Sequence, residues 1–118
     1  MRRGRALAEQ YGARWTGAEP EPGAELLINA TPIGMAGGPA ADEASFPDEV
    51  VAAASTVFEV VAVPATTPLL ALAARHGKRT MTGVAVTALQ AAEQFELYTG
   101  VRPTPDAIER ATAFSRAG

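Results

Sequence analysis

Short apolar runs alternate with segments of helical spacing along most of this chain. The runs at 25–29 and 56–63 are bounded by turn residues, as expected for buried strands. Caps, breakers and apolar periodicity predict helices between and after them. The expected strands are 13–16, 25–29, 56–63 and 79–81, and the expected helices cover 3–11, 48–54, 68–76, 84–98 and 105–113. This alternation predicts an α/β fold, in which helices flank a parallel sheet and two helices end the chain.

The ends of the predicted strands indicate where a site would lie. Right-handed crossovers bring the carboxyl ends of parallel strands to one edge of the sheet. Asn29, the 62–66 loop and Gly83 are therefore expected at a single edge. Ligands of open α/β folds bind at that edge, so the sequence predicts a site there.

Composition narrows the class of protein. The chain has 118 residues, of which 47% are hydrophobic and 19% charged, as expected for one small globular unit. A net charge of −3 gives no indication of a nucleic acid or an anionic membrane as partner. With no cysteine and one histidine, disulfides are excluded and no metal site is expected. No apolar run approaches about 18 residues and no signal peptide is recognisable, which fits a cytoplasmic protein.

Two glycine features each have two interpretations. The cluster at 34–38 does not match G-x-G-x-x-G and no helix follows it directly, so a flexible loop is favoured over a phosphate-binding loop. Gly83 stands where a strand meets a helix. It could allow a ligand to approach the backbone closely, or it could simply serve the turn.

Polar side chains on the predicted helices are also ambiguous. Gln90 is expected on an inner face, where it would bond either backbone groups or a bound polyol, and Gln94 competes with it. His76 follows a helix C-terminus, where a cation is stabilising without any catalytic role. Arg3 could be solvated or could meet a phosphate. The sequence offers no convincing nucleophile–base or carboxylate pair, so no catalytic residue is assigned.

Three segments together resemble the shikimate dehydrogenase family. Residues 27–35, Leu-Ile-Asn-Ala-Thr-Pro-Ile-Gly-Met, are similar to its INATPxGM segment. Pro64 with 67–70 resembles DxVYxPxxTPLL, and Gly83 with 90–100 resembles dGxxMLxxQAxxqFelwTG. Their order and spacing agree with the family. The resemblance implies a partial Rossmann-like sheet and the reduction of 3-dehydroshikimate to shikimate with NADPH.

The resemblance also implies roles for particular residues. Arg3 would be the last basic position of the clamp on the 2′-phosphate of NADP. The other cofactor positions would be Asn29, Ala30, Thr31, Val60 and Gly83, the last two through their backbone. Gln90 would bond a hydroxyl or carbonyl of a shikimate-like substrate. Ala62 replaces a substrate-contacting tyrosine and Glu59 replaces an aspartate, and Ala62 leaves quinate or an analogue open as the substrate. NAD in place of NADP also stays open, because Arg3 is the only residue that indicates NADP.

The same resemblance divides the chain and limits what it can do. Residues 1–83 would be part of an NADP-binding domain, and 84–118 would be C-terminal helices that pack back toward a substrate domain. The family's catalytic lysine and aspartate have no counterpart here, so the chain is expected to be a truncated or split product that is inactive alone. The alternative is a non-catalytic module or remnant that pairs with a complementing chain or forms a homo-oligomer.

Overall fold

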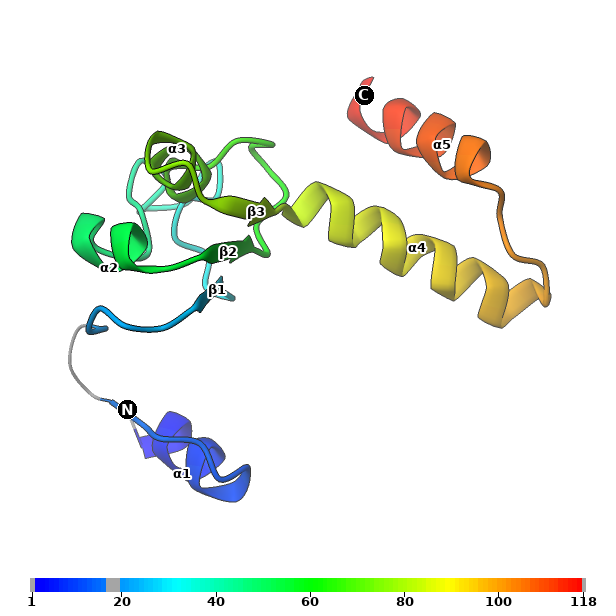
Figure 1. Ribbon diagram of the computed structural model, residues 1–118. Coiled ribbons are helices and arrows are strands. Elements are labelled where there is room, and N and C mark those ends of the chain that lie inside the picture. The colour runs from blue at the N-terminus through cyan, green and yellow to red at the C-terminus, as the bar shows by residue number, and fades with distance from the viewer. Residues whose placement is uncertain (1, 17–19, 118) are drawn as a thin grey trace.

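The centre of the protein is a three-stranded parallel sheet (Figure 1). The computed structural model describes residues 2–16 and 20–117. The strands β1 (Leu26–Asn29), β2 (Thr56–Glu59) and β3 (Arg79–Met81) lie side by side in chain order. Their register places Leu27 opposite Val57 and Asn29 opposite Glu59. The α/β fold with a parallel sheet, expected from the alternating pattern, is therefore confirmed.

One face of the sheet is covered by the helices of its two crossovers. These helices are α2 (Asp48–Ala53) and α3 (Pro68–Arg75). The buried core between them and the sheet consists of Leu27, Val50, Val51, Ala54, Val57, Leu69, Leu72 and Ala73. Phe46, from the long loop before α2, packs against this core. Burying this apolar surface is what holds the central unit together.

Helix α3 starts and stops as its sequence predicts. The Thr67 hydroxyl accepts the Leu70 N–H, Pro68 occupies the first helical position, and Gly77 adopts φ 63° behind the helix. His76, at the C-terminal cap, lies 3.1 Å from the Asp48 carboxylate at the start of α2. This contact joins the two helices and gives His76 a structural partner.

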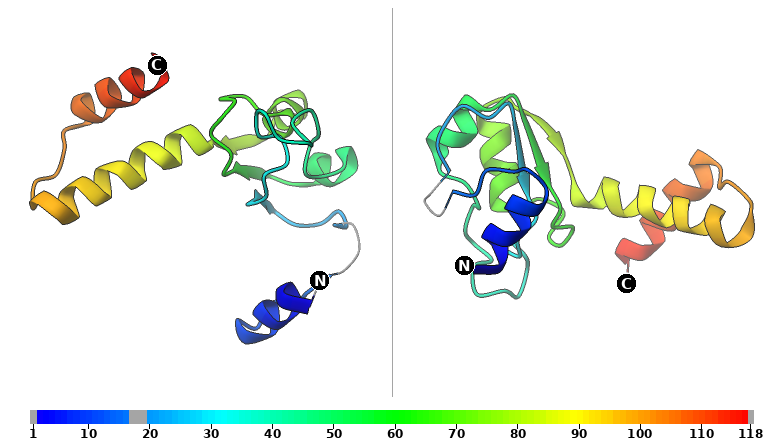
Figure 2. Two further views of the ribbon diagram at one scale, coloured as in Figure 1. Left: turned by 180° about the vertical axis from the view of Figure 1, so that it is seen from behind. Right: turned by 90° about the horizontal axis from the view of Figure 1, so that it is seen from below.

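Three helices extend beyond the central unit (Figures 1 and 2). Helix α1 (Arg2–Gln10) lies apart from the sheet, and α4 (Gly83–Thr99) projects away from β3 before α5 (Pro105–Ala117) folds back beside it. The radius of gyration is 16.5 Å, whereas a compact domain of this length would have about 13.5 Å. None of the described helices is long and apolar enough to span a membrane.

The hairpin of α4 and α5 turns at Gly100, which has φ 72° and caps α4 in the left-handed conformation. Arg102, in the connection, donates to Glu96 at 2.6 Å and to Glu93 at 2.5 Å. Hydrogen bonds to Glu96 and then Glu93 raise the pKa of Arg102 above its ordinary value. The Glu93 side chain is largely exposed and that of Glu96 is partly exposed.

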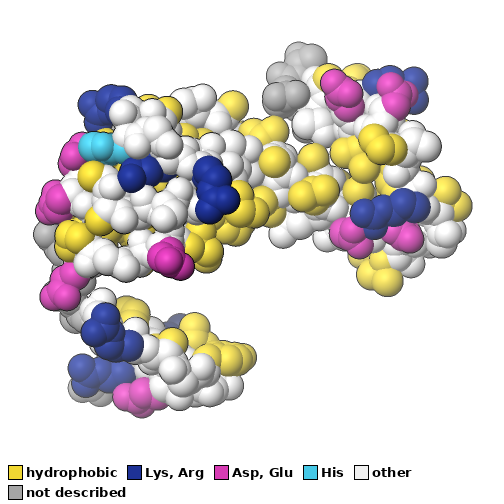
Figure 3. Space-filling model, viewed as in Figure 1, with side chains coloured by type: hydrophobic (Ala, Val, Ile, Leu, Met, Phe, Trp, Pro, Cys, Tyr) yellow, Lys and Arg dark blue, Asp and Glu magenta, His cyan; other side chains and the backbone are white. Residues whose placement is uncertain are grey.

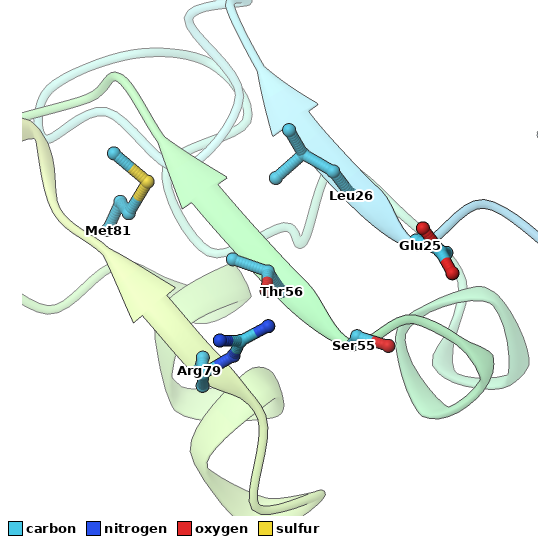
Figure 4. Close-up of a pocket in the computed structure, with 6 residues that line it drawn as sticks. All are labelled: Glu25, Leu26, Ser55, Thr56, Arg79 and Met81. Carbon is cyan, nitrogen blue, oxygen red and sulfur yellow. The ribbon is translucent and has the colours of Figure 1, made fainter.

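The second face of the sheet is open. Leu26, Ile28 and Met81 are between 48% and 50% exposed on this face, with Phe58 half-buried among them. A shallow pocket of about 340 Å³ lies over its amino-terminal half, lined by Glu25, Leu26, Ser55, Thr56, Arg79 and Met81 (Figure 4). Apolar side chains are also visible along the α4–α5 hairpin in the space-filling view (Figure 3). Parallel sheets are normally covered on both faces, so this exposure is unusual.

Three sequence predictions need correction. Residues 13–16 form no strand, because Ala13 donates to the Ala8 carbonyl and Trp15 packs over Gly4, so this segment folds back along α1. Strand β2 ends at Glu59 and not at residue 63. Helix α5 continues to Ala117, beyond the expected end near 113. The segment 17–23, whose two Glu-Pro pairs predict a loop, lies in part outside the described residues.

Candidate functional site

The carboxyl edge of the sheet brings Asn29 and Glu59 together. They are register partners on β1 and β2, and both side chains point toward the covered face with Leu27 and Val57. Their exposed fractions are 1% and 0%. The Asn29 side chain donates from Nδ2 to Glu59 Oε1 at 2.9 Å. Two adjacent strand ends are thus tied by buried polar groups at the edge where α/β proteins bind ligands.

Glu59 is a buried carboxylate that accepts three hydrogen bonds. Besides Asn29, the backbone N–H of Val61 donates to Oε1 at 3.0 Å, and the Thr67 hydroxyl donates to Oε2 at 2.8 Å. The bond from Val61 turns the backbone out of the sheet ladder, which explains why β2 ends here. Because a buried charge is costly without partners, these three donors account for its tolerance in the core.

The Asn29 amide is fully engaged inside the protein. Nδ2 donates to Glu59 and to the Ile33 carbonyl at 3.1 Å, while Oδ1 accepts the Thr31 N–H at 3.0 Å and the Thr31 hydroxyl at 2.7 Å. A primary amide has two donors and two acceptor positions, and all are used. Asn29 therefore shapes the turn, while Ala30 and Thr31 are the exposed residues at its surface.

Gly83 lies against the crossover that follows β2. A Cβ built on Gly83 would overlap the carbonyl oxygens of Val60 and Val61 and lie 2.5 Å from the Val61 carbonyl carbon. No other residue fits where α4 begins. The N–H of Val60 donates to the Asn29 carbonyl at 3.1 Å, and the Val60 side chain is 44% exposed. Asn29, the crossover and Gly83 therefore share one edge, as the strand ends predicted.

The glycine cluster at 34–38 is a set of closed turns. The amides of Gly34, Met35, Ala36 and Gly38 donate to the carbonyls of Ala40, Pro32, Val63 and Met35 respectively. Gly34 has φ 85° and is buried against Thr67 and Pro68. Since these amides already have acceptors, the geometry favours the loop interpretation over a phosphate-binding loop.

Two of the remaining predicted positions, Arg3 and Gln90, lie on helices that extend away from the sheet, whereas Ala62 lies in the crossover. Arg3 is exposed on α1, which stands apart from the sheet. Gln90 is exposed on α4, so the expected inner face and the need for buried partners do not apply. Ala62 is half-buried in the loop beyond β2. Among the described residues, the predicted positions at the strand ends lie close together. Arg3 on α1 and Gln90 on α4 lie away from them.

Sequence reasoning missed the importance of Glu59. It was noted only as a departure from the family pattern, although an acid at the end of an apolar, β-branched run is itself a signal of a partnered buried charge. The Thr67-Pro68 pair predicts the start of a helix, but no sequence pattern predicts the bond from the Thr67 hydroxyl to this carboxylate. No group of three or more metal-ligating side chains gathers among the residues that the structure describes.

Parallel strands, crossover helices on one face and polar groups at the carboxyl edge define an open α/β protein with a Rossmann-like sheet. Comparison with known proteins sharpens this class. A shikimate dehydrogenase-like protein of Haemophilus influenzae is 42% identical over 98% of this chain, and the match covers 43% of that protein. A solved shikimate 5-dehydrogenase-like structure superposes with a TM-score of 0.92 at 42% identity, over 98% of this chain and 43% of the other.

A third match links the fold to ligands of a relative. Shikimate 5-dehydrogenase from Thermus thermophilus, in complex with NADP(H) and shikimate, is 33% identical, with a TM-score of 0.70 over 95% of this chain and 42% of that one. No family model matches the chain. The chain belongs to the shikimate dehydrogenase family and spans about two fifths of the length of the relatives it matches.

Proposed function

We propose that the carboxyl edge of this sheet is one wall of an NADP site, in an oxidoreductase that acts on a shikimate-like compound. The observation that carries this proposal is the turn shaped by Asn29 and Glu59, which presents Ala30 and Thr31 at the edge where α/β folds bind ligands. Support comes from the Thermus relative, whose structure contains NADP(H) and shikimate.

The residues at this edge fit part of such a cofactor. The exposed Ala30–Thr31 turn and Val60 would hold the nicotinamide end, and Gly83, buried against the Val60 and Val61 carbonyls, would keep the crossover in place beside it. Four of the five amides at 34–38, those of Gly34, Met35, Ala36 and Gly38, already have backbone acceptors, so this loop does not fit a pyrophosphate. Arg3 would meet the 2′-phosphate. When bound, NADPH would supply the hydride for reduction of the substrate; this chain's contribution would be to orient the nicotinamide ring.

The hairpin that follows Gly83 would serve the substrate. Gln90 is exposed on α4, so its amide is accessible for a hydroxyl or carbonyl of a shikimate-like ligand. Ala62 offers no hydroxyl at the position of the family tyrosine, which favours a substrate that does not need that contact. We further propose that 1–83 belongs to the cofactor domain and that 84–118 packs against a substrate domain, because α4 and α5 expose Leu97, Tyr98 and Phe114.

The cofactor proposal is tested by calorimetric titration of the chain with NADP⁺ and, separately, with NAD⁺. Ala30→Glu places a carboxylate at the proposed contact and should weaken NADP⁺ binding at least about tenfold, through charge repulsion and steric overlap. Ala71→Glu, at an exposed position of α3, is the matched control and should bind as the parent does. Equal affinities for all three proteins would overturn the proposal.

Catalysis by this chain alone is not expected. The family's catalytic lysine and aspartate have no counterpart in this sequence, and hydride transfer requires both reactants at near-attack distance. NADPH oxidation with 3-dehydroshikimate should therefore stay at background with the purified chain. It should appear only when a segment carrying those residues is added. Turnover by the contaminant-free chain alone would contradict this.

A second candidate function is that of a non-catalytic module that pairs with another chain. The open face of the sheet, with Leu26, Ile28 and Met81 half exposed, favours it. The occupant would be a complementing shikimate dehydrogenase-like segment or a second copy. Sedimentation separates the two functions, because a compact monomer that binds NADP⁺ supports the first and a stable assembly without NADP⁺ affinity supports the second.

A further inference from the structure

Glu59 is a buried charged residue outside the set predicted to touch a cofactor. Its two carboxylate oxygens serve different parts of the fold. Oε1 accepts from Asn29 and from Val61, both at the candidate site, whereas Oε2 accepts from Thr67 at the start of α3. We infer that Glu59 is a positioning residue that sets the shape of the 30–31 turn by fixing the orientation of the Asn29 amide.

The orientation of the Asn29 amide determines which hydrogen bonds hold the 30–31 turn. Its Oδ1 accepts both the N–H and the hydroxyl of Thr31, so the oxygen must face the turn. The carboxylate of Glu59 enforces this, because an inverted amide would place Oδ1 opposite Glu59 Oε1 and Nδ2 opposite the Thr31 N–H. Two acceptors would then face each other, and two donors would do the same.

The same oxygen also fixes the neighbouring crossover. Val61 donates to Oε1 at 3.0 Å, and the Val60 and Val61 carbonyls are the groups against which Gly83 packs. One atom thus sets two segments of the proposed site, although Glu59 itself is fully buried and cannot contact a ligand. This inference rests on the proposed function only for its ligand; the geometry of the turn can be tested without one.

Glu59→Met and Glu59→Gln distinguish the roles of the two carboxylate oxygens, because methionine lacks both and glutamine keeps one. Methionine removes both acceptors at similar volume, so Asn29 Nδ2 loses its partner and Asn29 Oδ1 is no longer held toward the Thr31 N–H. Amide exchange at Thr31 should therefore speed up at least about tenfold. Glutamine keeps an oxygen for Asn29 and Val61 and turns its Nε2 toward Thr67. Exchange at Thr31 should then stay near the parent value. Rescue by glutamine is not expected of a side chain that only fills space.

Thr67→Val is the matched control. It removes the donor to Oε2 and the cap of α3 but leaves the Oε1 contacts in place. It should destabilise the protein while leaving Thr31 exchange, compared at equal global stability, unchanged. If Glu59→Met does not fold, the pair of Glu59→Gln and Thr67→Val decides, since both must retain slow exchange at Thr31. Loss of protection in either of them, or its retention in a folded Glu59→Met, would overturn the inference.

NADP⁺ titration of the same variants keeps the two proposals distinct. If the parent binds NADP⁺, Glu59→Met should raise its Kd at least about tenfold and Glu59→Gln should not, because only methionine releases the turn. If the parent does not bind NADP⁺, the proposed function fails. The exchange measurements then still decide whether Glu59 positions the turn.

Discussion

Gly83 and Val61 approach so closely that no side chain can stand between them. A Cβ at Gly83 would overlap the Val61 carbonyl group, and α4 begins at this point of contact. The close approach joins the projecting helix to the crossover of the proposed site. The sequence left open whether Gly83 serves a turn or a ligand; the packing shows that it is needed for the fold, whatever it also does for a ligand.

Gly83→Ala should therefore destabilise the protein, although alanine is the better helix former. We expect a loss of about 1–3 kcal/mol in the free energy of unfolding from overpacking. Gly100→Ala is the control, because Gly100 has open space around its Cβ position and φ 72°, so only backbone strain of about 1–2 kcal/mol is added. Urea denaturation measures both. A stabilised Gly83→Ala would show that the contact does not constrain the backbone.

Thr67 and Thr82 form a matched pair of helix caps. Each accepts a backbone N–H at 3.3 Å, but only Thr67 also donates to the buried Glu59. Thr82→Ala should cost about 1 kcal/mol, the ordinary value of a lost cap. Thr67→Ala should cost about 1–3 kcal/mol more, because the carboxylate loses a donor. Similar losses for the two variants in thermal or urea unfolding would mean that Glu59 gains little from Thr67.

The local elements could be predicted from the sequence because their determinants are local. β1 and the start of α3 follow from a short apolar run and from Thr67-Pro68, and the parallel arrangement follows from alternation. The end of β2 could not be predicted, since it depends on a contact between the Glu59 carboxylate and the Val61 amide.

The site was only partly predictable for a similar reason. Its place at the strand ends follows from topology, and Asn29 and Gly83 do lie at that edge. The full engagement of the Asn29 amide depends on partners from β2 and the following turn, which no spacing rule supplies. Gln90 is exposed because α4 projects away from the sheet, a tertiary fact that helical periodicity does not contain.

Charged substitutions on the open face should separate association from folding. Ile28→Glu should change the free energy of unfolding by less than about 0.5 kcal/mol, because that side chain is already half exposed. If this face carries the pairing of the second candidate function, the substitution should abolish concentration-dependent association in sedimentation velocity. Val57→Glu, fully buried on the other face, is the contrasting variant and should prevent folding. Association that persists in Ile28→Glu would assign pairing to another surface.

Arg102 should hold the α4–α5 connection together in a salt-dependent way. Arg102→Gln removes its ion pairs with Glu93 and Glu96, so proteolytic cleavage at 100–104 should become faster. Because the pKa of Arg102 is raised, its charge and its contribution are retained at neutral and mildly alkaline pH and are lost only as pH rises through the raised pKa. Its effect should thus persist through mildly alkaline pH and weaken with added salt. Cleavage of the parent that is insensitive to salt would argue against it.

The shared oxygen of Glu59 has a consequence for motion. Because the Asn29 amide and the Val61 N–H both donate to Glu59 Oε1, the departure of either segment removes a donor from this buried oxygen. The turn after β1 and the crossover after β2 should therefore open together as one cooperative unit, with the same free energy of opening. A molecule that orders either segment would rigidify both, so two stretches thirty residues apart in the chain would respond as a single element.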